Sequence, residues 1–214
     1  MGRPREFDPD EALVCALKQF WRHGYEGTSL SVLTEAMGIN RPSLYATFGT
    51  KEELFRKVLD LYCERYMADF DAILAEPTAR DVVGRQLLET VQLSTGAKTP
   101  HGCFGTNSAL ACSSEGEPIR QELVARRAQN QEALRVRLQR AKASGELPAD
   151  SDPADLACYI MTVSQGIAVQ AASGASREEL RRVADLALRG WPPSRAASRK
   201  GARAATTPRA KWRP

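Results

Sequence analysis

The stretch from Ser29 to Phe48 constrains the fold more than any other, because it has the pattern of two short helices joined by a tight turn. Ser29 offers a hydroxyl that can cap the first helix, whose apolar residues recur at helical spacing, and Gly38 can end it. Asn40 can then cap a second helix with Pro42 in its first turn, where a missing amide hydrogen costs nothing. This spacing predicts a helix-turn-helix, the second helix of which enters the major groove of DNA.

The second helix of this stretch has two distinct faces. Leu44 and Phe48 are expected to point into the protein, since they are the apolar residues four positions apart. The polar residues of the helix are expected to point outward, and these are Arg41, Ser43, Tyr45 and Thr47. The outward face therefore carries side chains that can bond to base edges and phosphates.

Three blocks of sequence around this stretch resemble the DNA-binding domain of the TetR family of bacterial transcriptional repressors. They read G-Y-E-G-T-S at residues 24–29, M-G-I-N-R at 37–41, and S-L-Y-A-T-F-G-T-K-E-E-L at 43–54. The last block is the specific one, because a turn followed at fixed distance by Leu-Tyr, Phe and Lys-Glu-Glu-Leu is hard to assemble by chance. Thr34 stands where the family often has alanine, and Thr47 where it often has histidine.

The resemblance implies an all-α fold of about nine helices. Residues 1–7 would form a flexible basic arm, and residues 8–66 a three-helix DNA-binding domain with its helix-turn-helix at 29–48. Residues 67–191 would form a C-terminal helical domain for ligand binding and dimerisation, followed by a disordered basic tail at 192–214. One long helix from residue 51 to about residue 74 would connect the two domains.

Double-stranded operator DNA is the expected partner, bound as a palindrome by a homodimer that acts as a repressor. The residues expected to contact DNA are Thr28, Ser29, Arg41, Pro42, Ser43, Tyr45, Thr47 and Lys51. Thr28, Ser29 and Lys51 stand at helix N-termini, where free amide groups favour phosphate. The arm with Arg3 and Arg5 either reaches a neighbouring groove or is a solvated terminus.

The last two predicted helices, at about 153–173 and 177–191, are expected to form the homodimer interface. The first contains the longest uncharged apolar run, residues 156–172, which includes four polar residues and is short for a membrane span. We therefore expect no membrane partner. Completion of the core within one monomer is the alternative role of these helices.

A small-molecule effector is implied by the family resemblance, with a pocket between the helices of the C-terminal domain. Aromatic and polar residues that could line it are Tyr62, Tyr66, Phe70, Phe104, Asn107, Tyr159 and Gln165. Each of them could equally belong to an ordinary core. A regulator that needs no ligand is the alternative, and it predicts a filled core with no cavity.

No catalytic constellation, metal site or cofactor motif is visible, so we expect no enzyme. The two histidines, His23 and His101, lie in no recognisable motif, and His101 with Cys103 and Cys112 matches no common metal spacing. Cys103 or Cys112 could instead act as a thiol sensor. The alternative interpretation is that both thiols are buried and inert. An enzyme tethered to DNA remains a third possibility that turnover by the purified protein would reveal.

Charge alone would not have indicated a DNA-binding protein. The net charge is +4, but seven of the 30 basic residues lie in the tail after Trp191, leaving 23 basic against 26 acidic residues. The tail could add non-specific attraction to phosphate. Five unpaired cysteines and an N-terminus without a signal-peptide pattern predict a bacterial cytoplasmic protein, associated with the nucleoid when it is bound to DNA.

Overall fold

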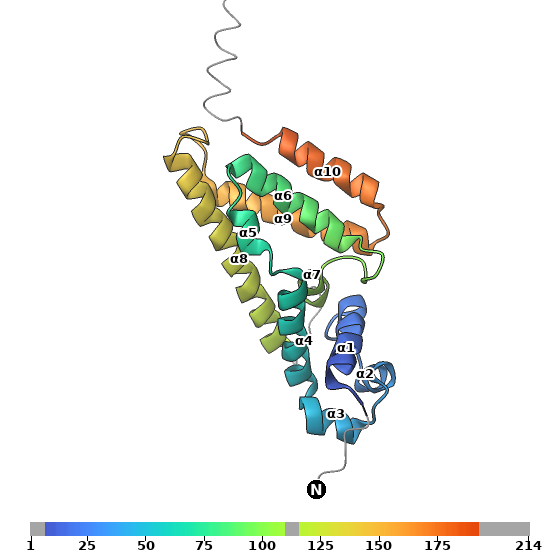
Figure 1. The fold of residues 1–214 in the computed structure, drawn as a ribbon. Helices are drawn as coiled ribbons and strands as arrows, with labels where there is room; N and C mark the ends of the chain where they lie inside the picture. Colours follow the sequence, from blue (N-terminus) through green and yellow to red (C-terminus); the bar gives the residue numbers. More distant parts are fainter. Residues whose placement is uncertain (1–6, 110–115, 193–214) are drawn as a thin grey trace, which may run out of the picture.

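The computed structural model describes residues 7–109 and 116–192, which form ten α-helices and no strand. The molecule is elongated, with α1, α2 and α3 at one end, α6, α9 and α10 at the other, and α4 and α8 running between them (Figure 1). The helices are α1 (Pro9–His23), α2 (Leu30–Met37), α3 (Arg41–Phe48), α4 (Lys51–Tyr66), α5 (Phe70–Leu74), α6 (Ala79–Ser94), α7 (Phe104–Ala109), α8 (Glu117–Ala143), α9 (Pro153–Ala172) and α10 (Arg177–Arg189). The expected basic arm up to residue 6 and the tail from residue 193 lie outside the described residues.

The N-terminal core forms where α1 packs against α2 and α4. Its largest buried side chains come from α1 and α4, and Phe20, Trp21 and Phe55 are each no more than 1% exposed. Phe20 and Phe55 meet edge to face with ring centroids 5.1 Å apart. Three residues from beyond position 100 complete this core, namely Phe104, Ile119 and Leu123. The first core therefore draws on α7 and α8 as well as on the first four helices.

The expected long helix from residue 51 to 74 was wrong, because the chain breaks after Tyr66 into α4 and α5. Met67 caps α4 with φ −120° and ψ 2°, and a turn leads to Phe70, whose amide donates to the Met67 carbonyl at 3.1 Å. The bend lets α5 pack on α6 and α8, where Ile73 is 5% exposed in the second core. This break accounts for ten helices in the described residues where about nine were expected.

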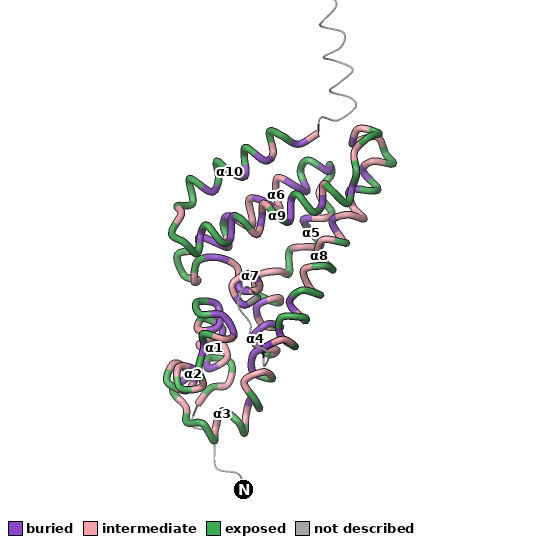
Figure 2. The backbone as a smooth tube through the Cα atoms, turned by 180° about the vertical axis from the view of Figure 1, so that it is seen from behind, coloured by how far each residue is buried: buried purple, intermediate pink, exposed green. Residues whose placement is uncertain are grey.

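The C-terminal core lies between α6, α8, α9 and α10. Helix α9 packs on both α6 and α8, and α10 lies across α6 and α9. Buried residues alternate with exposed ones along α10, so that one side of the helix faces the core and the other faces outward (Figure 2). Within the described ranges no helix is long and apolar enough to cross a membrane.

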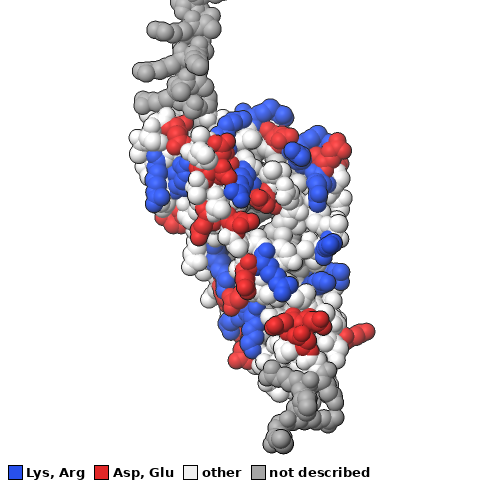
Figure 3. Space-filling view, in the orientation of Figure 1, with Lys and Arg blue, Asp and Glu red and all other residues white. Residues whose placement is uncertain are grey.

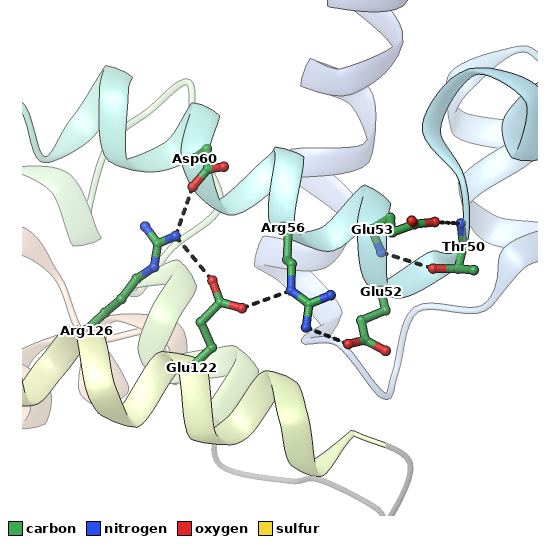
Figure 4. Close-up of polar contacts among 7 residues, drawn as sticks. All are labelled: Thr50, Glu52, Glu53, Arg56, Asp60, Glu122 and Arg126. Atoms are coloured by element: carbon green, nitrogen blue, oxygen red, sulfur yellow. Dashed lines mark hydrogen bonds and ion pairs between the residues drawn. The ribbon is translucent and has the colours of Figure 1, made fainter.

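A chain of ion pairs ties α4 to α8 (Figure 4). Glu122 on α8 accepts from Arg56 at 3.1 Å and from Arg126 at 3.2 Å. Arg56 also donates to Glu52 at 2.6 Å, and Arg126 to Asp60 at 2.9 Å. Since α4 follows directly on the helix-turn-helix, this network connects that end of the molecule to the longest helix of the C-terminal domain.

Candidate nucleic-acid interface

Local capping fixes the helix-turn-helix. Gly38 ends α2 in the left-handed conformation, with φ 66° and ψ 28°, which a residue with a β-carbon rarely adopts. The Asn40 side chain accepts from the Ser43 amide at 2.8 Å and so caps α3. Helix α3 therefore runs from Arg41 to Phe48 as expected, and it lies at the end of the molecule farthest from α10 (Figure 1).

The two faces of α3 are divided as the sequence predicts. Leu44 and Phe48 are 0% and 4% exposed and anchor the helix, whereas Tyr45 is 49% exposed. Arg41 and Pro42 are also exposed, and Ser43 and Thr47 are half-buried. The structure thus places five of the expected DNA-contacting residues on one short helix.

A hydrogen bond to α2 orients the side chain of Arg41. Its Nη2 donates to the Ser31 hydroxyl at 3.0 Å. The exposed Ser29 caps α2, with its hydroxyl accepting from the Val32 amide at 3.2 Å. A cation and a helix N-terminus therefore lie on neighbouring helices, both favourable for a phosphate.

Thr28 was wrongly expected to contact DNA. Its side chain is 0% exposed, and its hydroxyl donates to the Gly24 carbonyl at 2.7 Å. The hydroxyl therefore closes the turn after α1 and cannot reach a phosphate.

Two lysines flank α3, and one of them was missed by sequence reasoning. Lys51, which was expected, lies with its Nζ 4.3 Å from the centre of the Tyr25 ring. Lys57, which was not, donates from its Nζ to the Phe48 carbonyl at 3.1 Å. A cation at a helix C-terminus is stabilising, and Lys57 supplies it to α3 from the next helix. The only signal in the sequence was a lysine nine residues after the helix ends.

The start of α4 is fixed by a capping box. The Thr50 amide donates to Glu53 Oε2 at 2.7 Å, and the Glu53 amide donates to the Thr50 hydroxyl at 3.2 Å. Hydrogen bonds from the amide and the hydroxyl of Thr50 lower the pKa of Glu53 from its usual value of 4.5. The ionised carboxylate therefore holds the junction between α3 and α4.

A cavity of about 460 Å³ lies between α4, α6, α7, α8 and α9. Of the residues expected to line a pocket, Tyr62, Tyr66, Phe70 and Gln165 do so. Its volume falls within the range of about 300–1,000 Å³ that is usual for sites of small organic molecules.

Three residues expected in the pocket lie elsewhere. Phe104 is 0% exposed and packs between Phe55 and Tyr62 in the N-terminal core, with centroids 5.2 Å and 5.1 Å away. Asn107 donates from its Nδ2 to the Trp21 carbonyl at 3.1 Å. Tyr159 is 44% exposed on the outer face of α9. These three predictions were wrong because long-range packing, which side-chain type does not reveal, decides which face of each helix meets the cavity.

Cys103, one of the two proposed thiol sensors, lies in the cavity wall. Its Sγ is 3.6 Å from the Tyr62 hydroxyl, and burial raises the pKa of that hydroxyl well above its usual value. Cys112 lies outside the described residues. Cys63, half-buried on α4, has its pKa raised by burial, which disfavours the reactive thiolate.

The segment from Gly102 to Asn107 connects the cavity to α1. Cys103 contributes to the cavity wall, while two hydrogen bonds from the same segment reach Trp21. The Trp21 indole donates to the Gly102 carbonyl at 3.0 Å, and Asn107 returns a bond to the Trp21 carbonyl at 3.1 Å. A shift of this segment at the cavity wall would therefore act directly on Trp21, which lies in the core of the N-terminal domain.

The last two helices expose apolar side chains on their outer faces. On α9, Tyr159 and Val169 are 44% and 37% exposed, and on α10, Val183 and Leu186 are 46% and 63% exposed.

Acidic and basic side chains are interspersed over the face of the molecule seen in Figure 3, with no large area of a single sign. Among the described residues, no group of three or more His, Cys, Asp or Glu side chains could hold a metal ion.

Comparison with known proteins places these features in one family. Residues 12–58 match the model of the bacterial regulatory proteins of the tetR family, and residues 85–187 match that of the tetracyclin repressor-like C-terminal domain. The HTH-type transcriptional repressor ComR of Escherichia coli K12 is 39% identical over 193 residues, covering 89% of this chain and 92% of ComR.

Two solved structures are similar along most of the chain. A cysteine mutant of the TetR family regulator CifR, complexed with 26-base-pair operator DNA, has a TM-score of 0.83 and 44% identity and covers 89% of this chain and 100% of CifR. A TetR regulator from Rhodococcus sp. RHA1 has a TM-score of 0.60 and 43% identity and covers 87% and 100% of the two chains. Together with the exposed recognition helix α3, these matches show that the chain belongs to the TetR family and is a DNA-binding transcriptional regulator.

Proposed function

We propose that this regulator is a repressor that binds a palindromic operator as a homodimer and leaves it when a small molecule occupies the cavity. The observation that carries the proposal is the exposed, doubly capped α3, which presents Arg41, Ser43 and Tyr45 at one end of the molecule. The relative ComR is named a repressor, and CifR is described in complex with operator DNA.

In this proposal, Arg41, Ser43 and Thr47 contact base edges or nearby backbone, and Tyr45, Lys51 and the α2 cap Ser29 contact phosphate. Pro42 stiffens the first turn of α3 against the DNA. Two copies of α3 would read half-sites about 34–36 Å apart. The protein would then be nucleoid-associated while it is bound.

The homodimer would form through α9 and α10. Their outer faces carry four of the six large hydrophobic residues that are more than a third exposed among the described residues. Two helices from each copy would pack as a four-helix bundle and bury Tyr159, Val183 and Leu186. The α3 helices would then project from the same side of the dimer.

The cavity favours an effector-controlled regulator over one that needs no ligand, since the latter predicts a filled core. A ligand there would touch Tyr62 and Tyr66 on α4, and Cys103 in the segment that bonds to Trp21. Both routes lead into the N-terminal core, so a ligand that prefers one arrangement of α4 would change the spacing of the α3 helices. Such coupling is typically worth about 1–3 kcal/mol.

A reporter assay tests this function. Duplexes that the purified protein enriches from random DNA are placed between a promoter and a reporter gene in a bacterial host. The proposal predicts lower reporter output when the protein is expressed, and recovery when Tyr45→Ala replaces it. Increased output would show an activator, and unchanged output would refute transcriptional control through that DNA.

A second candidate is a thiol-responsive regulator, favoured by the position of Cys103 in the cavity wall. Alkylation of the purified protein with iodoacetamide, followed by operator binding, separates the two candidates. Release that Cys103→Ser abolishes would support thiol control. Release that persists in the variant would exclude Cys103 as the sensor.

A further inference from the structure

The cavity holds polar atoms that the fold leaves without partners. Ser94 on α6 and Ser164 on α9 both line it and are 1% and 7% exposed. Their hydroxyls, together with the Gln86 carbonyl oxygen Oε1, have no hydrogen-bond partner within the described ranges 7–109 and 116–192. A buried polar atom left unpaired destabilises the fold, so three of them in one cavity call for an explanation.

Other hydroxyls in and next to α6 and α9 do have hydrogen-bond partners. Thr90 on α6 donates to the main-chain carbonyl of Gln86 at 2.8 Å, and Thr95, the C-cap of α6, donates to the Val91 carbonyl at 2.7 Å. On α9, Thr162 donates to the Cys158 carbonyl at 2.8 Å. The preceding turn satisfies these three hydroxyls, including that of Thr90, which also lines the cavity, whereas it does not satisfy those of Ser94 and Ser164.

Helical spacing brings the polar atoms onto two facing walls. Gln86 and Ser94 are eight residues apart on α6 and so lie on one side of that helix, which packs against α9 and Ser164. A single molecule between the two helices can reach both walls. It must offer a donor to Gln86 Oε1, which can only accept, and a group that pairs with serine hydroxyls.

The remaining lining determines the charge and polarity of that molecule. The rest of the wall is mainly apolar and aromatic, with Tyr66, Phe70, Ile73, Leu93 and Met161 among its residues. The charged residues of the lining are two arginines and two acids, Arg65, Asp69, Glu89 and Arg127, whose formal charges cancel. Arg65 and Asp69 are exposed, so water screens them.

We infer that the cavity binds an uncharged alcohol or phenol with an apolar body, its hydroxyl donating to Gln86 Oε1 on α6 and accepting from the Ser164 hydroxyl on α9. This inference rests on the proposed control of operator binding by a ligand in the cavity, and it specifies the chemistry of that ligand. A carboxylate places negative charge against an acceptor, and a hydrocarbon leaves the three polar atoms unpaired.

Calorimetric titration of the purified full chain tests the ligand class with matched probes. Naphthol and octanol are compared with naphthalene, naphthoate and octanoate. The hydroxylated probes are expected to bind more tightly than the hydrocarbon and the carboxylates. Equal or tighter binding of the carboxylates, or no binding by either alcohol, would overturn the inference.

Two substitutions locate the site. Ser164→Ala and Gln86→Leu are each expected to weaken binding of the better alcohol about two- to tenfold, the usual effect of one neutral hydrogen bond. Ser164→Ala should also leave thermal stability unchanged or higher, because it removes an unpaired polar atom. Ser144→Ala, which removes a satisfied and exposed hydroxyl at the C-terminal end of α8, outside the proposed dimer interface, is the control and should bind like the parent.

Operator binding separates the failure of this inference from failure of the proposed function. All three variants should bind operator normally without ligand, and the alcohol should release the parent at lower concentration than it releases Ser164→Ala. Unchanged alcohol affinity in both cavity variants, with operator binding intact, refutes the ligand chemistry alone. Absence of operator binding by the parent refutes the proposed function instead.

Discussion

Glu122 is the centre of the ion pairs that join α4 to α8, and its replacement by glutamine gives a quantitative test of that connection. The carboxylate accepts from Arg56 and Arg126 at 3.1 Å and 3.2 Å (Figure 4). The hydrogen bonds of Arg56 with Glu122 and Glu52 raise the pKa of its guanidinium above the usual value. Glu122→Gln keeps the size of the side chain and removes the charge that both arginines share.

The magnitude is modest because the groups are partly solvated. The side chains of Glu122, Arg56 and Arg126 are 26%, 43% and 36% exposed. Partly exposed pairs contribute about 0.2–1 kcal/mol each, so losing two should lower the free energy of unfolding by about 1 kcal/mol. Salt should shrink the difference, since the Debye length falls from about 8 Å at physiological ionic strength to about 3 Å at 1 M.

The assay is urea unfolding at fixed protein concentration, at low and at high salt. Glu132→Gln is the matched control, because Glu132 pairs with Arg135 on the surface of the same helix and is 58% exposed. We expect the control to change stability by much less than Glu122→Gln does. If Glu122→Gln behaves like the control, or if its effect does not depend on salt, the ion pairs do not hold α4 to α8.

Three further outcomes are expected. Thr28→Val should destabilise the protein by about 1–2 kcal/mol, since the Gly24 carbonyl loses its buried donor, and should leave the salt dependence of operator binding unchanged in fluorescence anisotropy; a reduced salt slope would restore Thr28 as a phosphate contact. The lowered pKa of Glu53 stabilises the fold above pH 4.5, and this contribution is lost as the pH falls through the lower folded value, so thermal melts of Glu53→Gln should depend less on pH in that acidic range than those of the parent; parallel profiles would contradict the capping box. Leu186→Asp should yield monomers in sedimentation equilibrium, and a persistent dimer would place the interface elsewhere.

The helix-turn-helix could be predicted residue by residue because its signals are local. Gly38 ends α2 and Asn40 caps α3 through bonds to atoms within a few residues of themselves, so the sequence around them is sufficient. The break after Tyr66 has no such signal, because there is neither glycine nor proline between residues 51 and 76. It arises from the packing of Ile73 against helices that come later in the chain.

The cavity was only partly predictable for the same reason. Tyr62 and Tyr66 were expected to line it and do, since they lie one turn apart on the same side of α4. Phe104 and Tyr159 have equally suitable side chains, but the neighbours of α7 and α9 turn them toward the N-terminal core and toward the outside. The unpaired Ser94 and Ser164 could not be found from sequence, because a helical serine usually bonds to its own preceding turn.

The most direct test of the account is selection of random duplex DNA on the purified protein, repeated with Tyr45→Ala, Ser43→Ala and the control Gln139→Ala. Gln139 is exposed on α8, far along the chain from α3. We expect enrichment of an inverted repeat with half-sites about one DNA turn apart, weakened by both α3 substitutions and unaffected by the control. No enrichment, or enrichment that is indifferent to Tyr45 and Ser43, would contradict the claim that α3 is the DNA-reading surface.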